Sequence, residues 1–140
     1  MSTAFLQCPG NALQLFSVLL RAGKLGADAE TAQKSLRAGL TFAKVIYADT
    51  DSYVGATPTE LAAGEPSLTF TAGPADPASP TSISVANVDD TRIVMAAGNG
   101  SYCYFIRDSA AGSGTQFAGG PGSTCDATHM PSQWTSKGWR

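Results

Sequence analysis

The sequence predicts an α+β fold in which one long N-terminal helix packs on a sheet of roughly four antiparallel strands. Apolar residues recur at helical spacing between residues 26 and 53, whereas the chain from residue 68 onward has short alternating runs separated by Gly, Pro and Asn. A helix followed by a series of strands is the order of elements typical of this class. The 140 residues suit one such domain with a modest core.

The charge of the chain argues against a nucleic-acid partner. The net charge is -2 and only 14% of the residues are charged, whereas a nucleic-acid surface needs clustered Lys and Arg. The polar residues are mostly Ser, Thr, Gly and Asn, a composition common among secreted β-rich proteins.

Residues 1–25 are expected to form an atypical N-terminal segment ahead of a domain at 26–140. The first ten residues look irregular because of a Pro-Gly pair, and a short amphipathic helix follows over residues 11–20. Its apolar part is much shorter than the ~20 residues needed to cross a bilayer, and it lacks the flanking features of a signal peptide. Gly23 and Gly26 predict a bend or break before the main helix.

The main helix is expected over residues 26–53, capped at its start by Asp28. Before Leu36 it is mostly polar and small, so this end is predicted to project into solvent or into a partner. After Leu36 it is apolar on most sides and must be covered. The residues predicted to pack on the sheet are Leu36, Leu40, Ala43 and Tyr47, and the opposite polar stripe consists of Lys34, Arg37, Thr41 and Lys44.

Asp49 and Asp51 lie where this helix is expected to fade. Two readings apply to them: a turn that ends the helix, or a calcium site, because calcium prefers clustered oxygen ligands. A calcium site needs six or more oxygens, and few others can be named nearby. The turn is therefore favoured, and no cofactor is expected.

Four strands are predicted after a short helix over residues 57–63, which Thr57 caps and Pro58 begins. A Pro-rich loop over residues 72–81 separates the first two strands. Asn99 and Gly100 are predicted to form the type I′ turn of a hairpin between the last two strands. The four strands are expected over residues 68–71, 82–88, 92–97 and 102–107.

The C-terminal part reads as a Gly-rich loop over residues 109–124, followed by a tail whose two tryptophans are expected to close the edge of the domain. Of three cysteines, Cys103 and Cys125 are 22 positions apart, and a bridge between them would stabilise the domain by about 3 kcal/mol. Such a bridge implies an oxidising compartment; the alternative is two unrelated thiols in a reducing one.

Catalysis is not expected. His129 is the only histidine, it lies in an irregular tail, and no Ser or Cys nearby has the setting of a nucleophile. The paired acids at 49/51 and 89/90 fall at predicted turns, where carboxylates are usually solvated. The Gly-rich loop opens no helix and lacks the Lys and Ser or Thr of a phosphate-binding motif.

Several stretches together resemble a known family. The segment SLRAGLTFAKVIYADTDSY, then TPTELAAGEPSLTF, then SYCYFIRD and the late Cys125 resemble the globular domain of type IV pilins of actinobacterial type and of type II secretion pseudopilins. The resemblance covers roughly Leu25–Arg140. It implies a ladle-shaped structural subunit that assembles, with copies of itself and with other pilins or pilus machinery, into an extracellular filament. It also implies a disulfide-bounded C-terminal region on the filament surface.

The resemblance fails in residues 1–25. The Gly-Phe processing site and the long apolar helix with a Glu at its fifth position are absent from this stretch. Three explanations fit: the membrane helix was removed, the start of the gene is misassigned or altered, or the chain is a divergent relative whose residues 13–20 pack elsewhere. Membrane contact is expected only if an apolar N-terminal helix is missing. The alternative function is a secreted binding or adhesion module that uses the Pro-rich loop and the Gly-rich tail.

Overall fold

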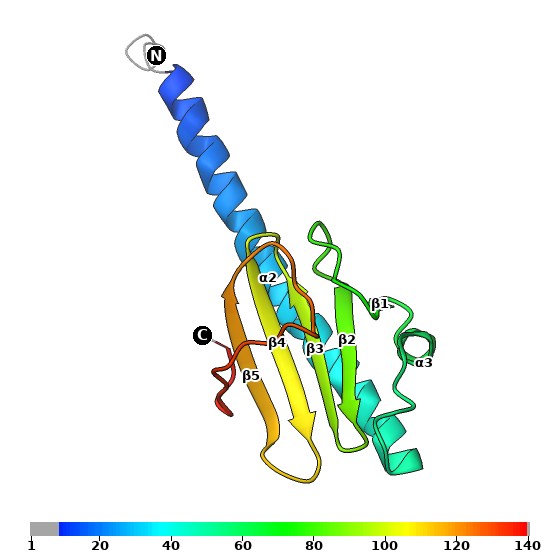
Figure 1. Cartoon of the computed structure of the whole chain (residues 1–140). Helices are drawn as coiled ribbons and strands as arrows, with labels where there is room; N and C mark the ends of the chain where they lie inside the picture. The colour runs from blue at the N-terminus through cyan, green and yellow to red at the C-terminus, as the bar shows by residue number, and fades with distance from the viewer. Residues whose placement is uncertain (1–8, 140) are drawn as a thin grey trace.

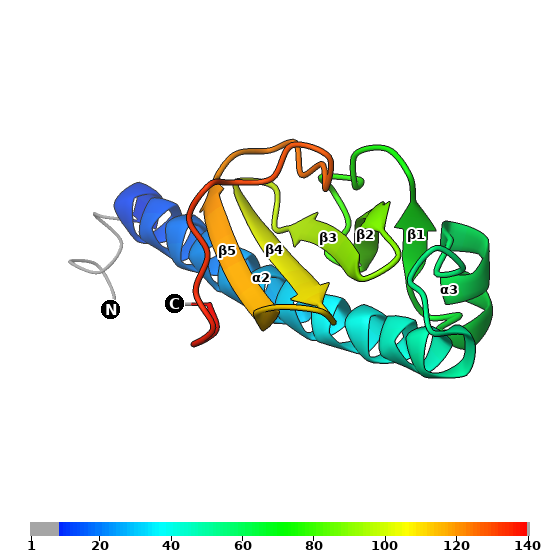
Figure 2. The same ribbon diagram turned by 60° about the horizontal axis from the view of Figure 1, so that its bottom comes forward.

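One long helix and a five-stranded sheet dominate the molecule (Figure 1). The computed structural model describes residues 9–139, with side chains described from residue 26 onward except those at 87 and 88. The helix α2 (Pro9–Thr50) lies along one face of the sheet with its C-terminal half, and its N-terminal half extends beyond the sheet (Figures 1 and 2). A short helix, α3 (Pro58–Gly64), packs beside β1, on the side of the sheet away from β5 (Figure 1).

The helix α2 is continuous, so the prediction of a bend or break at Gly23 and Gly26 is wrong. A glycine in a helix interior costs only about 1 kcal/mol relative to alanine and does not by itself end the helix. The expected irregular pair at Pro9 and Gly10 is also wrong, because the helix begins at Pro9 and proline is tolerated in a first turn. With 42 residues the helix is about 63 Å long.

The C-terminal end of α2 lies close to the predicted position. The helix ends at Thr50 rather than at residue 53. Asp51 follows with a φ of 59°, and its N–H donates to the Tyr47 carbonyl at 2.7 Å. This left-handed residue stops the helix and satisfies one of its last carbonyls. The short helix α3 begins as predicted, because the Thr57 hydroxyl accepts from the Glu60 N–H at 3.3 Å.

The sheet has five strands in sequence order and is mixed, so the prediction of about four antiparallel strands is wrong in number and in one direction. Strand β1 pairs with β2 in parallel, while the other neighbours are antiparallel. The parallel pair arises because the loop over residues 72–81 carries the chain back to the end of β1 where that strand begins, so that Ser82 starts β2 beside Thr69. The strands are β1 (Thr69–Thr71), β2 (Ser82–Asp89), β3 (Arg92–Gly98), β4 (Tyr102–Ser109) and β5 (Gly114–Pro121).

Strand β5 occupies the segment that the sequence predicted as a Gly-rich loop. It pairs with β4 along its whole length, from the Ser109–Gly114 pair to the Tyr102–Pro121 pair. A glycine-rich segment has low intrinsic β-propensity, but ladder hydrogen bonds use the backbone and packing on the neighbouring strand overrides the propensity. Gly119 also has a packing role, because a Cβ there would lie 2.8 Å from the Tyr102 ring.

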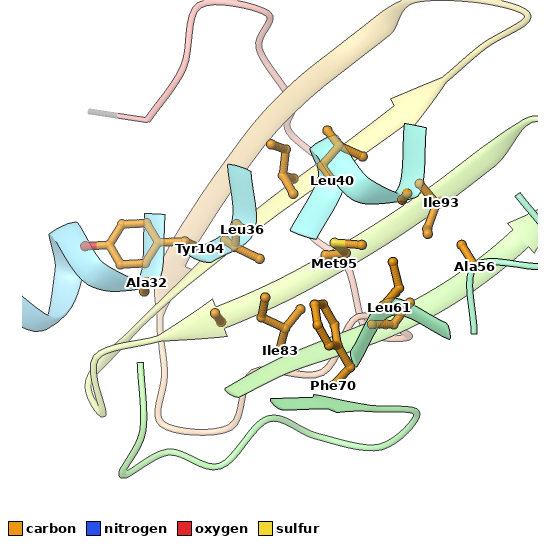
Figure 3. Close-up of a cluster of buried hydrophobic side chains, with 14 of the residues drawn as sticks. Ala32, Leu36, Leu40, Ala56, Leu61, Phe70, Ile83, Ile93, Met95 and Tyr104 are labelled. Atoms are coloured by element: carbon orange, nitrogen blue, oxygen red, sulfur yellow. The ribbon is translucent and has the colours of Figure 1, made fainter. Parts of the chain in front are cut away.

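The core lies on both faces of the sheet. On the helix side, Leu36 and Ala43 are fully buried, Leu40 is 4% exposed, and Tyr47 packs half-buried at the margin. Gly39 lets α2 approach closely, because a Cβ there would lie 3.1–3.3 Å from Phe70, Met95 and Ile83 side chains. The strand residues of this layer, several of them drawn in Figure 3, are Phe70, Ile83, Val85, Ile93, Met95, Ala97, Tyr104, Ile106 and Phe117.

A second apolar layer covers the opposite face of the sheet. It joins the Pro-rich loop and the C-terminal tail to β3, β4 and β5, and its buried members are Ala75, Val94, Ala96, Cys103, Phe105, Ala118, Cys125 and Ala127. Alternation along β4 agrees with the sequence prediction, since Tyr104 and Ile106 face the helix while Cys103 and Phe105 face away. Among the described residues, no helix combines the length and apolarity needed to cross a membrane.

Candidate functional site

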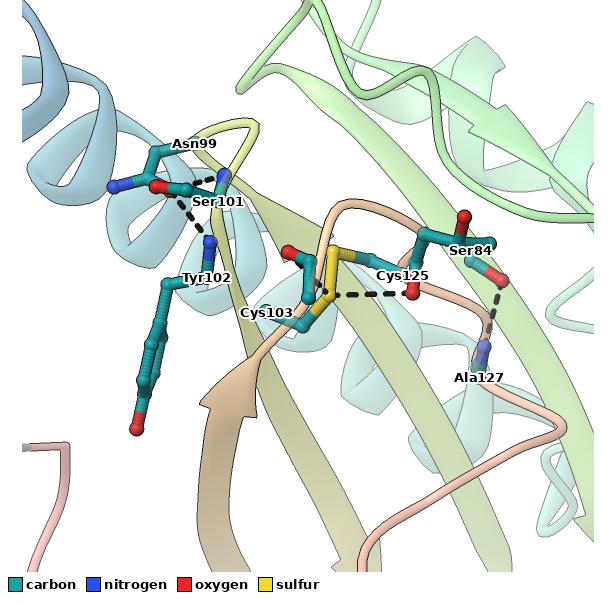
Figure 4. Close-up of a disulfide and its surroundings, with 9 residues drawn as sticks. Ser84, Asn99, Ser101, Tyr102, Cys103, Cys125 and Ala127 are labelled. Atoms are coloured by element: carbon teal, nitrogen blue, oxygen red, sulfur yellow. Dashed lines mark hydrogen bonds between the residues drawn. A yellow bond between two sulfur atoms is a disulfide. The ribbon is translucent and has the colours of Figure 1, made fainter.

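The disulfide between Cys103 and Cys125 fixes the C-terminal tail to the sheet (Figure 4). The two Cα atoms are 5.4 Å apart, and both residues are buried. Gly98 leaves the necessary space, because a Cβ there would lie 2.5 Å from the Cys125 sulfur and 2.6 Å from the Tyr102 carbonyl oxygen. The predicted pairing is therefore confirmed, and Cys8 lies outside the described residues.

Backbone and hydroxyl contacts extend this attachment along the far face. The Ala127 N–H donates to the buried Ser84 hydroxyl oxygen at 2.9 Å, and the Ala75 N–H donates to the Cys125 carbonyl at 2.9 Å. The tail and the Pro-rich loop thus hold each other as well as the sheet. The loop is anchored further by the Asp76 N–H, which donates to the Ser82 hydroxyl at 2.8 Å.

The hairpin turn beside the disulfide differs from the predicted type I′. Among the described non-glycine residues only Asp51 has a positive φ, so Asn99 lacks the left-handed backbone that type I′ requires. Gly100 has a φ of 96°, and the Asn99 N–H donates to the Tyr102 carbonyl at 3.2 Å, so Gly100 and Ser101 form the centre of the turn. The Asn99 side-chain oxygen accepts from the N–H groups of Ser101 and Tyr102 at 3.0 and 2.9 Å (Figure 4). The side chain of Asn99, the first residue of the turn, therefore stabilises the turn.

The two tryptophans of the tail lie on opposite faces of strand β5. Thr135 pairs with Phe117 through two backbone hydrogen bonds of 2.7 and 3.0 Å, so the tail crosses the outer edge of the strand at this point. Before the crossing, Trp134 packs edge-on against Phe105 on the far face. After it, Trp139 packs edge-on against Phe117 on the helix side, with ring centroids 4.8 Å apart. The prediction that the tryptophans close the edge of the domain agrees with this arrangement.

An aromatic groove of about 510 Å³ opens where the tail leaves the edge of β5. Its aromatic lining includes Tyr102, Tyr104 and Trp139, whose rings contact one another in sequence with centroid distances of 5.0 and 6.0 Å. Tyr102 is 37% exposed. The indole N–H of Trp139 is occupied, because it donates to two backbone carbonyls at 3.0 Å. The groove therefore offers aromatic faces to a partner. We refer to it below as the β5-edge groove.

Cationic side chains border this groove. The Arg37 guanidinium lies 5.1 Å from the Phe117 ring centroid and 5.0 Å from that of Trp139, within cation–π range. On the far face the Arg107 guanidinium lies 4.1 Å from the Trp134 ring centroid. Lys137 is exposed in the tail between the two tryptophans. The polar stripe of α2 predicted from the sequence thus runs beside β5.

A buried polar cluster lies next to this stripe. The Tyr53 hydroxyl donates to Asp108 at 2.5 Å, and the Thr115 hydroxyl donates to the other oxygen of the same carboxylate at 2.9 Å. Lys44 approaches that carboxylate to 3.6 Å and donates to the Thr115 hydroxyl at 2.9 Å. Burial of Tyr53, together with its bond to Asp108, raises the pKa of the phenol well above its ordinary value. All members of the cluster satisfy one another, so its role is structural.

The residues considered for metal binding or catalysis do not come together. In the part of the chain that the structure describes, no three His, Cys, Asp or Glu residues gather as a metal-ligand set. Asp49 and Asp51 are exposed at the end of α2, in agreement with a turn. The side chain of His129 is 83% exposed, and its nearest ionic partner is Asp126 at 3.4 Å.

Comparisons of the chain with models of protein families, with curated proteins and with solved structures find no match. The geometry itself therefore indicates where function resides. Two features of the described domain are open to a partner: the half of α2 that projects beyond the sheet, and the β5-edge groove. The sequence predicted a projecting helix end but placed it too late in the chain: Ala32 and Ser35, before Leu36, are buried, and the part that projects comes before Ala29. It missed the second, because Gly119 and the two tryptophans give no sign in the sequence that they lie together.

Proposed function

We propose that the chain is a structural subunit that assembles into an extracellular helical filament of the type IV pilus or type II secretion kind. The observation that carries this proposal is the shape of α2. Among the side chains that the structure describes, from residue 26 onward, the first of α2 that packs on the sheet core is Ala29, and Figure 1 shows the preceding part of the helix, about 20 residues or about 30 Å, extending past the sheet. A rigid helix of this length that the rest of its own domain leaves uncovered is suited to packing against helices of other copies.

The sequence of the projecting half supports such packing. The apolar residues between positions 12 and 20 recur at the spacing of one helix face. The sheet, by contrast, is covered by α2 on one face and by the loop and tail on the other. In the assembly that we propose, the helices form the centre of the filament and the sheets form its outer layer. The disulfide supports a non-reducing setting, which an extracellular filament would have.

Electron microscopy of the purified chain and of its native source tests the proposal. Filaments that contain the chain are expected. Phe16→Asp, in the projecting half, should abolish them, because it places a charge in the helix packing. The melting temperature of the domain should stay the same, since the half of α2 that contains residue 16 extends past the sheet (Figure 1). Filaments that persist in this variant would overturn the role proposed for α2.

A second function has one observation in its favour. The β5-edge groove presents aromatic faces at the surface, as a binding or adhesion module does. A protein that stays monomeric under all conditions, and in which Phe16→Asp changes nothing, would favour this alternative.

A further inference from the structure

The two ends of the described domain carry opposite net charge, although Asp28, Glu30 and Lys34 of α2 and Asp126 of the tail lie outside the two sets that follow. One end contains α3, the loop before β2 and the end of α2, and the other contains strand β5 with the adjoining stripe of α2 (Figure 1). The acidic residues at the first end are Asp49, Asp51, Glu60, Glu65, Asp76, Asp89 and Asp90. The basic residues at the second end are Arg37, Lys44, Arg107 and Lys137.

One charge of the opposite sign at each end is paired with a neighbour. Arg92, at the acidic end, forms an ion pair with Asp89 at 2.9 Å. Asp108, at the basic end, is 7% exposed and lies 3.6 Å from Lys44, so these two charges offset each other and the excess positive charge of this end comes from Arg37, Arg107 and Lys137. The net field therefore runs from one edge of the sheet to the other. Such a charge distribution orients identical molecules head to tail and accelerates their encounter.

Each end also carries an apolar feature that complements the other. Val54 is 56% exposed, the highest value among the large hydrophobic side chains that the structure describes. It lies in the link between α2 and α3, with Asp51 before it and Glu60 after it. On the side of β5, the β5-edge groove offers aromatic faces. Arg37 lies over the ring of Trp139, which lines the groove, and Lys137 precedes the lining residue Gly138 in the chain. One end thus has an apolar projection among acids, and the other has an apolar recess among bases.

We propose that a second copy of this chain inserts its Val54 segment into the β5-edge groove. The inference rests on the proposed filament function and names the contact that the globular domains would make in it. A groove of about 510 Å³ is large enough for Val54 and parts of its neighbours. Because the Val54 segment and the β5-edge groove are separate surfaces with no residue in common, each copy keeps one free groove and one free Val54 segment after docking. The contact is heterologous and does not close on itself, so it propagates along a filament.

Two single variants test the contact in the full chain. Val54→Lys removes the apolar projection and adds a positive charge near the acids, while Lys137→Glu reverses the charge beside Gly138, which lines the groove. Both positions are exposed, so the fold should be retained. In the Phe16→Asp background, which blocks the helices, sedimentation velocity should show head-to-tail association that each variant weakens about tenfold or more. Raising the salt from about 50 mM to about 0.5 M should weaken it as well.

Mixing the two variants provides the decisive measurement. Val54→Lys still offers an intact groove, and Lys137→Glu still offers an intact Val54 segment. At a concentration where each variant alone is mainly monomeric, an equimolar mixture should therefore form heterodimers through the one intact pair of surfaces. Ala111→Glu, in the exposed β4–β5 loop, is the matched control and should associate like the parent chain.

The outcomes separate this contact from the proposed filament. Filaments of the otherwise unchanged chain that are as salt-stable in both variants as in the parent would overturn the groove contact and leave the helix assembly standing. Association that Lys137→Glu abolishes and Val54→Lys does not would show that something other than Val54 enters the groove, and would also overturn the inference. Groove-dependent association without filaments would instead refute the proposed role of α2.

Discussion

Removal of the Cys103–Cys125 disulfide is the perturbation whose magnitude follows most directly from the structure. The bond spans 22 positions and encloses most of β4, the β4–β5 turn, β5 and the start of the tail. In the chain-entropy description, closing a loop of this length removes about 11 cal/mol/K from the unfolded chain. At 25 °C this corresponds to about 3.4 kcal/mol of stability.

Urea unfolding of three samples separates this effect from packing. Reduced wild-type protein keeps both sulfurs and should lose about 3.4 kcal/mol, which is a fall in the urea midpoint of about 2 M for an m-value of about 1.5 kcal/mol/M. The double variant Cys103→Ala with Cys125→Ala should lose about 1–2 kcal/mol more, because two buried sulfur atoms are also removed. Oxidised wild-type protein is the reference.

The reasoning fails if reduction leaves the urea midpoint unchanged within error. In that case the segments inside the loop would already be ordered in the unfolded chain, or the bond would be absent in solution. Non-reducing mass spectrometry decides between these two, because the linked peptides of Cys103 and Cys125 are either present or absent.

Three further predictions concern packing and pH. Ala43→Asp should unfold the domain, because it buries an unpaired charge at a fully buried position, and a cooperative thermal transition near that of wild type would contradict the placement of α2. Gly98→Ala should lower the free energy of unfolding by about 1–3 kcal/mol in chemical unfolding, because its Cβ would meet backbone and disulfide atoms. Gly26→Ala, with open space around it, should instead raise it by up to about 1 kcal/mol, and equal effects would refute the packing argument. The raised pKa of Tyr53 contributes stability that is complete below the ordinary pKa of 10.0 and is lost as the pH rises toward the folded-state pKa. Tyr53→Phe should therefore be less stable at neutral pH, and its free energy of unfolding should fall less than that of wild type above pH 10. An identical alkaline fall in both proteins would mean that another group controls it.

The local elements that the sequence predicted correctly are those set by short-range chemistry. The cap of α3 at Thr57, the end of α2 near Asp51 and the alternation along β4 each depend on residues within a few positions of one another. The buried face of α2 also follows from spacing alone, as Leu36 and Ala43 illustrate. These features were predictable because a helix period or a capping side chain acts within one or two turns.

The errors arose where distant segments decide the outcome. Gly114–Pro121 became strand β5 because β4 offered an edge, although its own composition favours a loop. The continuity of α2 through Gly23 and Gly26 shows in turn that two glycines do not outweigh the helical residues around them.

The sequence by itself determined the α+β class, the main helix, its buried face and the pair of cysteines able to bridge. Only the tertiary structure decided the parallel β1–β2 pair, the fifth strand and the β5-edge groove. The groove exists because Thr135 crosses the edge of β5 and places one tryptophan on each side of it. No local pattern encodes such a crossing, since its free energy comes from contacts between residues that are far apart in the chain.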